Sequence, residues 1–213
     1  MTLKILKGID ERINPLHTAL ILIDMQRDLV YDNYLCDKAG RDLSATRNVI
    51  PNMQRLVSRA RSVGVTICHV GFWSLPENGS DSAAWLQQRR RSTYSSDSLC
   101  IAGTPGAEFI DELRPERNEI VIHKHRYSAF KGTDLDMILR ARSIKTVITA
   151  GVSTNVCVES TLRDAFETGY YVVIPSDATA SWNMELHKST LETVKHRFGY
   201  VANTAEIINH WEK

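Results

Sequence analysis

Apolar runs of strand length alternate along the chain with segments of helical periodicity, and this alternation constrains the fold more than any other feature of the sequence. The run TALILIDM is apolar without interruption up to Asp24, which is typical of a parallel strand buried on both faces. Strands are predicted at 18–25, 65–72, 119–124, 146–151, 170–175 and 200–202, and helices at 44–63, 107–113, 134–142, 154–168, 184–197 and 205–211. The order predicts an α/β fold, a three-layer doubly wound sandwich with a mostly parallel six-stranded sheet.

Size and charge narrow the class of protein. No linker or repeat divides the 213 residues, so a single domain over 1–213 is expected. The near balance of 26 Lys+Arg against 25 Asp+Glu disfavours nucleic acid as a partner. No apolar stretch approaches the roughly 18 residues of a membrane span. The charged N-terminal segment lacks the apolar core of a signal peptide, so a cytoplasmic protein without membrane partners is predicted.

Three chemically distinctive residues fall at the carboxyl ends of predicted strands. Asp24 closes the first strand, Lys124 closes the third, and Cys157 follows the fourth after a break at Gly151. Parallel sheets bind ligands beyond the carboxyl ends of their strands, so these side chains are expected to meet there. Taken singly, Asp24 could be a turn cap, Lys124 a solvated strand end and Cys157 a space-filling residue. Their convergence favours a functional site.

Cys157 lies in the first turn of a predicted helix that opens near Ser153 or Thr154. The partial positive charge of a helix N-terminus favours a thiolate there, and exposed N–H groups can hold an oxyanion. Asp24 could accept the thiol proton, while Lys124 would lower the pKa of Asp24 and also favour the thiolate. The three residues together predict a cysteine nucleophile. The four cysteines Cys36, Cys68, Cys100 and Cys157 are widely spaced and are expected to be free thiols.

Three segments carry a resemblance to a known family: ALILIDMQRDLV, HKHRYSAFKGTDLD and GVSTNVCVESTLRDAFETGYYVVIPSDATAS. Together they resemble the isochorismatase-like cysteine hydrolases, over about residues 17–211. The resemblance implies a catalytic triad of Asp24, Lys124 and Cys157 and a cis peptide bond between Val152 and Ser153. It also implies an oxyanion hole formed by the amides of Ser153 and Cys157, and a homodimer or homotetramer.

The resemblance also implies a substrate class. Members that hydrolyse isochorismate can lack the cysteine, so Cys157 favours cleavage of an amide or ureide. The segment RYSAFKGTDLD is most similar to members that act on ureides, such as ureidoacrylate amidohydrolases, N-carbamoyl amino acid amidases and biuret hydrolases. A cysteine-dependent amidohydrolase that acts on a small ureide or N-carbamoyl compound through a thioester is predicted. The alternatives are hydrolysis of a cyclic or aromatic amide or of isochorismate on the same fold, and a non-catalytic binding module.

Neither a metal nor another cofactor is expected. Family members that cleave nicotinamide bind a metal through an Asp and His cluster after the second strand, where this chain has His69 but no Asp-x-His. His123 and His125 flank Lys124 and are expected on the opposite strand face. A zinc site would need a third ligand there.

Four residues are candidates for binding substrate: Gln26, Trp73, Arg126 and Tyr127. Arg126 could hold a carboxylate or ureido oxygen through its fork of donors, or form an outward salt bridge instead. Tyr127 could wall the pocket or pack as core. The long segment 73–105 has no clean period and is expected to shape the pocket. Its triplet Arg89-Arg90-Arg91 is either a solvated helix face or an anion site folded over the pocket.

Overall fold

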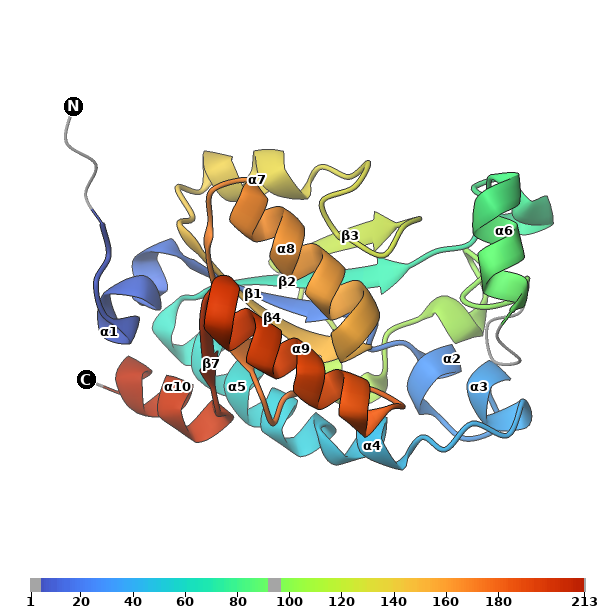
Figure 1. The fold of residues 1–213 in the computed structure, drawn as a ribbon, viewed down its shortest axis with the longest axis horizontal. Helices are drawn as coiled ribbons and strands as arrows, with labels where there is room; N and C mark the ends of the chain where they lie inside the picture. The colour runs from blue at the N-terminus through green and yellow to red at the C-terminus, as the bar shows by residue number, and fades with distance from the viewer. Residues whose placement is uncertain (1–4, 92–96, 213) are drawn as a thin grey trace.

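One parallel sheet lies between two layers of helices in this computed structural model, which describes residues 5–91 and 97–212 (Figure 1). Within these residues seven strands form the sheet, in the order β3-β2-β1-β4-β5-β7 with β6 beside β4, and the paired strands run parallel. The strands are β1 (Thr18–Ile23), β2 (Thr66–Phe72), β3 (Ile120–Lys124), β4 (Thr146–Val152), β5 (Tyr171–Pro175), β6 (Thr179–Ala180) and β7 (Tyr200–Ala202). The predicted doubly wound α/β fold is confirmed. The added strand β6 spans two residues, too few to show a period in the sequence.

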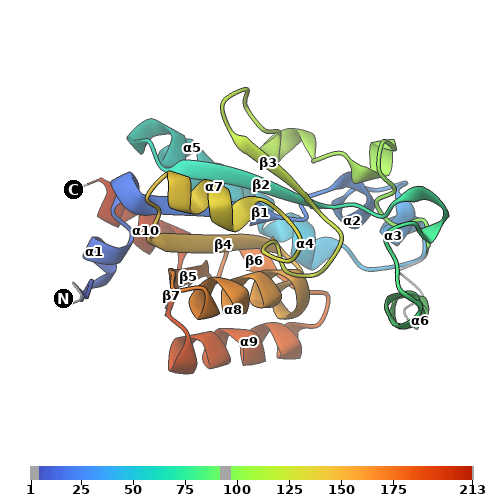
Figure 2. The ribbon, with the colours of Figure 1, turned by 90° about the horizontal axis from the view of Figure 1, so that it is seen from above.

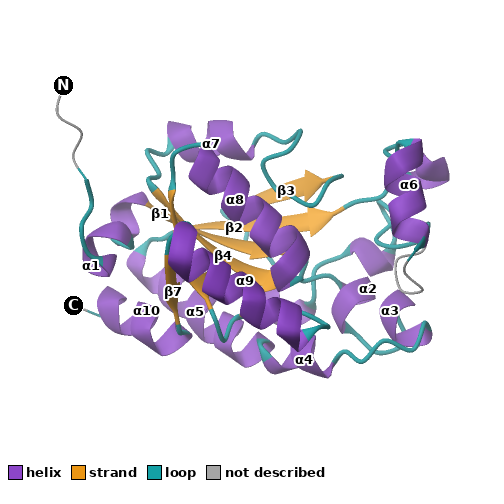
Figure 3. Ribbon diagram, in the orientation of Figure 1, coloured by secondary structure: helices purple, strands orange, loops and turns teal. Residues whose placement is uncertain are grey.

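Helices cover both faces of the sheet because the central strands are apolar on both sides. Figure 2 shows α5 and α10 on one side of the sheet and α8 and α9 on the other, and Figure 3 shows the strands enclosed between them. Leu20 and Leu22 of β1 pack in one core cluster, whereas Ala19, Ile21 and Ile23 pack in the other. The helices of the first layer are α4 (Ser44–Asn48), α5 (Ile50–Val63) and α10 (Thr204–Trp211), and those of the second are α7 (Leu135–Ala141), α8 (Glu159–Glu167) and α9 (Met184–Arg197).

The helix predicted over 44–63 is two helices. Pro51 falls in the first turn of α5, where its missing N–H costs no hydrogen bond, so a new helix begins there instead of α4 continuing. Gly64 ends α5 in the left-handed conformation, with φ of 77°. The predicted short helix at 107–113 is instead a pair of 3₁₀ turns, at Pro105–Ala107 and Asp111–Leu113.

Four short helices were not predicted: α1 (Ile9–Arg12), α2 (Arg27–Val30), α3 (Leu35–Lys38) and α6 (Ala83–Arg90). α6 belongs to the long segment 73–105, of which residues 92–96 lie outside the described part of the chain. Ser82 caps it by accepting a hydrogen bond from the Trp85 amide. Figures 1 and 2 show α6 apart from both helical layers, beyond the carboxyl ends of the strands.

The strand order determines where a ligand site can form. The chain winds from β1 outward to β3, then crosses to β4 on the other side of β1 and winds outward again. Connections on the two sides of such a reversal diverge and leave a crevice at the carboxyl ends of the central strands. Asp24 follows β1, and the turn that carries Cys157 follows β4.

No helix in the described ranges is long and apolar enough to cross a membrane.

Gly151 lets β4 approach β1 closely at this crevice. It pairs with Ile23 at φ of 117°, and a Cβ at this position would lie 2.1 Å from the Ile23 carbonyl oxygen. Gly40 has a similarly positive φ of 81°, but a Cβ there would meet nothing within 4 Å. A side chain at either glycine would therefore be strained by the positive φ. Only at Gly151 would it also clash with the neighbouring strand.

Gly151→Ala is expected to lower the free energy of unfolding by about 1–3 kcal/mol more than Gly40→Ala, because only the first forces two strands apart. Urea titration of both variants measures the difference. Equal losses in the two variants would contradict the close packing inferred for β1 and β4.

A partly buried carboxylate ties β2 to the start of β3. Glu119 Oε2 lies 2.8 Å from His69 Nε2, and Arg61 Nε donates to Glu119 Oε1 at 2.8 Å. Burial by itself raises the pKa of Glu119, but hydrogen bonds from Arg61, the Glu116 amide and His69 outweigh it and lower the pKa to about 2. Because the ordinary value is 4.5, the folded state gains stability from ionised Glu119 above that pH and loses it as the pH falls toward 2.

Urea unfolding at near-neutral pH and at about pH 3 should therefore show a loss of stability on acidification that Glu119→Gln makes smaller. The amide cannot titrate, so it removes this contribution to the pH dependence. A Glu119→Gln protein with the same acid loss as the parent would show that Glu119 does not contribute to it.

Candidate active site

The structure brings Asp24, Lys124 and Cys157 together at the crevice. Lys124 Nζ donates to Asp24 Oδ2 at 2.9 Å and lies 3.3 Å from Cys157 Sγ. The three residues are 2%, 0% and 9% exposed, respectively. An ammonium therefore lies between a carboxylate and a thiol in a site that is almost closed to solvent.

Backbone geometry at three strand ends positions these groups. Asp24 adopts a φ of 55°, a left-handed conformation that Asp tolerates better than most residues, and its amide donates to the Val70 carbonyl. Lys124 is the last residue of β3 and alternates with exposed Val121 and His123, so its side chain points inward. The Lys124 carbonyl accepts from the Trp73 amide at 2.8 Å. Sheet register therefore fixes two of the three groups.

Cys157 sits in a π-helical turn, Thr154–Val158, that precedes α8. Thr154 Oγ1 lies 2.8 Å from His187 Nδ1 and 3.1 Å from Thr179 Oγ1, so the turn is tied to α9 and β6. The sequence predicted an ordinary helix start with a Ser or Thr cap. Instead Ser153 makes no side-chain cap bond, and its Oγ donates to Asn155 Oδ1 at 2.9 Å. The peptide bond between Val152 and Ser153 is cis, as the resemblance implied.

Burial and charge set the ionisation of the site. Burial raises the pKa of Asp24, although Lys124 acts in the opposite direction. Burial alone would lower the pKa of Lys124, but the nearby Asp24 raises it above its ordinary value. The pKa of Cys157 is raised by burial and further by Asp24. The helix start was expected to make this thiol ionise easily, but burial and the neighbouring Asp24 both act in the opposite direction.

A cavity of about 330 Å³ opens onto Asp24, Ser153 and Cys157. Its wall is mainly aromatic and apolar, with a few polar side chains, as in most small-molecule sites. The other lining residues are Leu29, Arg41, Phe72, Trp85, Arg89, Leu99, Tyr127, Val152, Asn155, Val156, Ser181, Trp182 and Asn183.

Gln26 does not line this cavity. Its Nε2 donates to the carbonyls of Phe72 and Ala107 at 2.9 and 2.8 Å, and its Oε1 accepts from the Phe72 amide at 2.8 Å. The side chain is completely buried and binds backbone only. The expectation that Gln26 contacts substrate is therefore not retained, because its amide joins the end of β2 to the 3₁₀ turn at Ala107.

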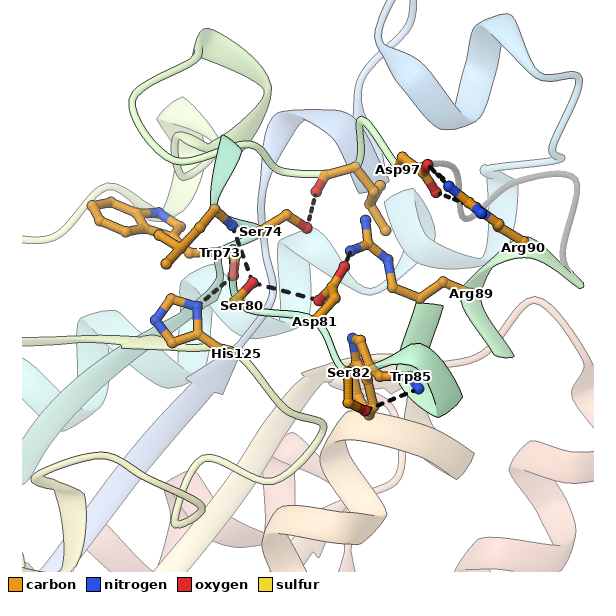
Figure 4. A network of polar contacts seen from close by, with 12 residues as sticks. Trp73, Ser74, Ser80, Asp81, Ser82, Trp85, Arg89, Arg90, Asp97 and His125 are labelled. Carbon is orange, nitrogen blue, oxygen red and sulfur yellow. Dashed lines mark hydrogen bonds and ion pairs between the residues drawn. The ribbon is translucent and has the colours of Figure 1, made fainter. Parts of the chain in front are cut away.

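Trp73 faces away from the site. Its ring stacks on His123 with centroids 3.5 Å apart and lines a separate cavity with Val121 and His123. Figure 4 shows Trp73 on the far side of the strand end from Arg89 and Trp85. Trp73 is therefore not retained as a residue that stacks on substrate, because the strand end turns its ring toward the outer face of β3.

Of the other two predicted substrate contacts, Arg126 lies outside the cavity lining and Tyr127 belongs to it. Arg126 donates to the carbonyls of Ser80 and His125 and lies over the Trp85 ring at 5.0 Å, outside the cavity lining. It supports the cavity wall instead of facing a ligand. Tyr127 does line the cavity, with its ring centroid 4.5 Å from that of Trp85.

Sequence reasoning missed most of the lining, including the large side chains of Arg41, Trp85 and Trp182. Arg41 and Trp182 lie outside regular helices and strands, and Trp85 lies in the short helix α6, so their only signal was residue type. Arg89 was weighed as part of the Arg89–Arg91 triplet, and it is the member of the triplet that lines the cavity.

A metal site does not emerge from the histidines. His123 stacks on Trp73, and His125 Nδ1 lies 2.7 Å from the Trp73 carbonyl. Over residues 5–91 and 97–212, no group of three or more His, Cys, Asp or Glu side chains is placed to hold a metal ion.

A parallel doubly wound sheet with Asp, Lys and Cys at its carboxyl edge can also be compared with known proteins. The isochorismatase domain model matches residues 18–206, so the chain belongs to the isochorismatase family. The ureidoacrylate amidohydrolase RutB of Acinetobacter baylyi is 35% identical over 221 residues, covering 98% of this chain and 90% of that protein.

Solved structures agree with this assignment. A cysteine hydrolase from Pseudomonas syringae superposes with a TM-score of 0.83 at 27% identity, covering 100% of this chain and 99% of that one. An N-carbamoylsarcosine amidase from Thermoplasma acidophilum superposes with a TM-score of 0.70 at 26% identity, covering 88% and 96%.

The charge arrangement predicts how the thiol titrates. Asp24→Asn removes a negative charge that raises the pKa of Cys157, so thiolate should form at lower pH than in the parent protein. Iodoacetamide alkylation, followed by peptide mass spectrometry across a pH series, reports Cys157 separately from the other three cysteines. Cys157→Ser gives the background. An unchanged or raised alkylation pH in Asp24→Asn would contradict the inferred coupling.

Proposed function

We propose that this chain is a cysteine amidohydrolase that cleaves a C–N bond of a small ureide or N-carbamoyl compound. The observation that carries the proposal is the single buried ammonium within reach of both a carboxylate and a thiol, at the wall of a cavity. The relatives named for ureidoacrylate and N-carbamoylsarcosine supply the substrate class.

The first half-reaction forms a bond between Cys157 Sγ and the substrate carbonyl carbon. Asp24 accepts the thiol proton as the sulfur attacks, and a carboxylate with a raised pKa is a stronger base than one in water. Asp24 Oδ2 is occupied by Lys124, whereas Oδ1 is buried and has no hydrogen-bond partner in the described part of the chain, so Oδ1 is suited to take the proton. The amides of Ser153 and Cys157 hold the oxyanion.

Collapse of this intermediate breaks the C–N bond. The proton on Asp24 passes to the departing ammonia or amine, and the acyl group remains on sulfur as a thioester. Asp24 then activates water, whose attack on the thioester releases the acid and returns the proton to sulfur. For a carbamoyl substrate that loses ammonia, the product is a carbamate, which decomposes to the amine and carbon dioxide.

Lys124 balances charge throughout this cycle. When the proton is on Asp24, the thiolate of Cys157 is the charged partner of the ammonium. When the proton is on the thiol, the carboxylate of Asp24 is that partner. A buried charge without a partner is costly, so an ammonium within reach of both groups lowers the cost of moving the proton between them.

Cys157→Ala should lower ureide turnover by more than about 10³-fold while the protein remains folded, since the nucleophile is lost and the scaffold is kept. Ammonia release from a panel of ureides, carbamoyl amino acids and aromatic amides measures turnover, and circular dichroism checks the fold. Cys68→Ala is the matched control, because Cys68 is a buried cysteine of β2 that packs in the core, and its loss should leave turnover intact.

Intact mass spectrometry with a slow ureide should show an acyl adduct on the parent protein and none on Cys157→Ala. Retained turnover in Cys157→Ala would exclude the cysteine mechanism. A ligand that binds both proteins equally without being hydrolysed would identify a binding module instead.

A further inference from the structure

Two arginines from distant segments line the cavity that opens onto Cys157. Arg41 follows α3, and Arg89 belongs to α6. Asp24 is the one acidic group among the described lining residues, and Lys124 already pairs with it. The lining therefore presents two guanidinium groups, one of them held by Asp81, and guanidinium N–H donors suit an anionic group on the ligand.

The charged side chain of Arg89 is buried and held by an ion pair. It is 3% exposed, and its Nη1 donates at 2.5 Å to Asp81, itself 1% exposed. Its guanidinium carbon lies 5.9 Å from the centre of the Phe72 ring, which also lines the cavity. A charged arginine is seldom buried without a partner, and Asp81 here offsets the cost of keeping one at the cavity wall.

Figure 4 shows the network that holds this part of α6 in place. Ser80 hydrogen-bonds to Asp81, and the Ser80 carbonyl accepts from Arg126 at 2.9 Å. Arg126 in turn lies over the Trp85 ring. The segment that carries Arg89 is therefore anchored to the chain just after β3, next to the active-site lysine.

Arg41 is positioned by an aromatic ring of the cavity wall. Its guanidinium carbon lies 4.1 Å above the Trp182 ring, and both residues line the cavity. Arg41 also interacts with the Cys36 thiol, and the several N–H donors of a guanidinium allow it to bind a carboxylate as well.

We propose that Arg41 and Arg89 form an anion subsite that selects ureides carrying a carboxylate at the end remote from the scissile carbonyl. This inference rests on the proposed function and assigns the specificity of that site. The ureido carbonyl lies at Cys157, the carboxylate lies between the two guanidinium groups, and the short connecting chain packs on Trp85 and Tyr127. Charge-assisted, fork-like hydrogen bonds then supply the binding energy that a neutral ureide lacks.

The test compares a carboxylate substrate, β-ureidopropionate, with N-propylurea, a neutral ureide of the same chain length. Arg41→Gln and Arg89→Gln should each lower kcat/KM for β-ureidopropionate by about 10- to 100-fold, mainly through KM, and change that for N-propylurea little. Arg90→Gln is the matched control from the same helix, since its side chain is 58% exposed and pairs with Asp97 outside the cavity. It should leave both substrates unaffected.

Arg89→Gln also removes the partner of buried Asp81, so a second variant keeps the test valid if that protein does not fold. Arg89→Lys retains the charge opposite Asp81 and loses the fork of donors, so it should show the same selective rise in KM. Equal losses for both substrates, or no loss for β-ureidopropionate, would overturn the anion subsite.

Calorimetry on Cys157→Ala separates this inference from the proposed function. Tighter binding of β-ureidopropionate than of N-propylurea, lost when Arg41→Gln is added, supports the subsite even if the parent protein hydrolyses neither compound. Equal binding of the two compounds overturns the subsite even if the parent protein hydrolyses both.

Discussion

The buried ammonium of Lys124 is the interaction on which the rest of the site depends. A completely buried lysine is tolerated only where partners offset its desolvation, and here Asp24 and Cys157 provide them. The three groups come from the ends of β1, of its neighbour β4, and of β3, which is separated from β1 by β2. The ammonium of Lys124 can be paired only if three features occur together. These are the strand order, the register of β3 against β2, and the position of the turn after β4.

Burial and the carboxylate of Asp24 both raise the pKa of the Cys157 thiol. A cysteine at an exposed helix N-terminus would be expected to ionise readily, but Cys157 is buried and faces a carboxylate. In the proposed reaction, Cys157 gives its proton to Asp24 only when a substrate carbonyl is close enough to be attacked. The three other cysteines are buried in the protein interior.

The proposal assigns chemistry and selectivity to different parts of the molecule. The proposed reacting groups lie at the ends of strands, where register and packing hold them, in the fold that the family shares. Arg41, Trp85, Arg89 and Trp182 come from segments outside the two helical layers, which can vary without disturbing the core. Such a division allows related proteins to act on different substrates with the same scaffold.

The sequence by itself determined the parallel sheet, because continuous apolar runs such as TALILI can only be buried on both faces, and with it the meeting of Asp24, Lys124 and Cys157 at one edge. α9 and β7 were predicted with the bounds that the structure shows, since their patterns are local. Tertiary structure alone decided the roles of Gln26, Trp73 and Arg126, because the side to which a residue turns after a strand end depends on backbone bonds to distant segments. It also decided the place of Arg89, because whether a charged helix faces solvent or a cavity depends on where the flanking loops are anchored. For α6 that anchor is a hydrogen bond from Arg126, just after β3, to Ser80 in the segment that precedes the helix, and no local pattern encodes it.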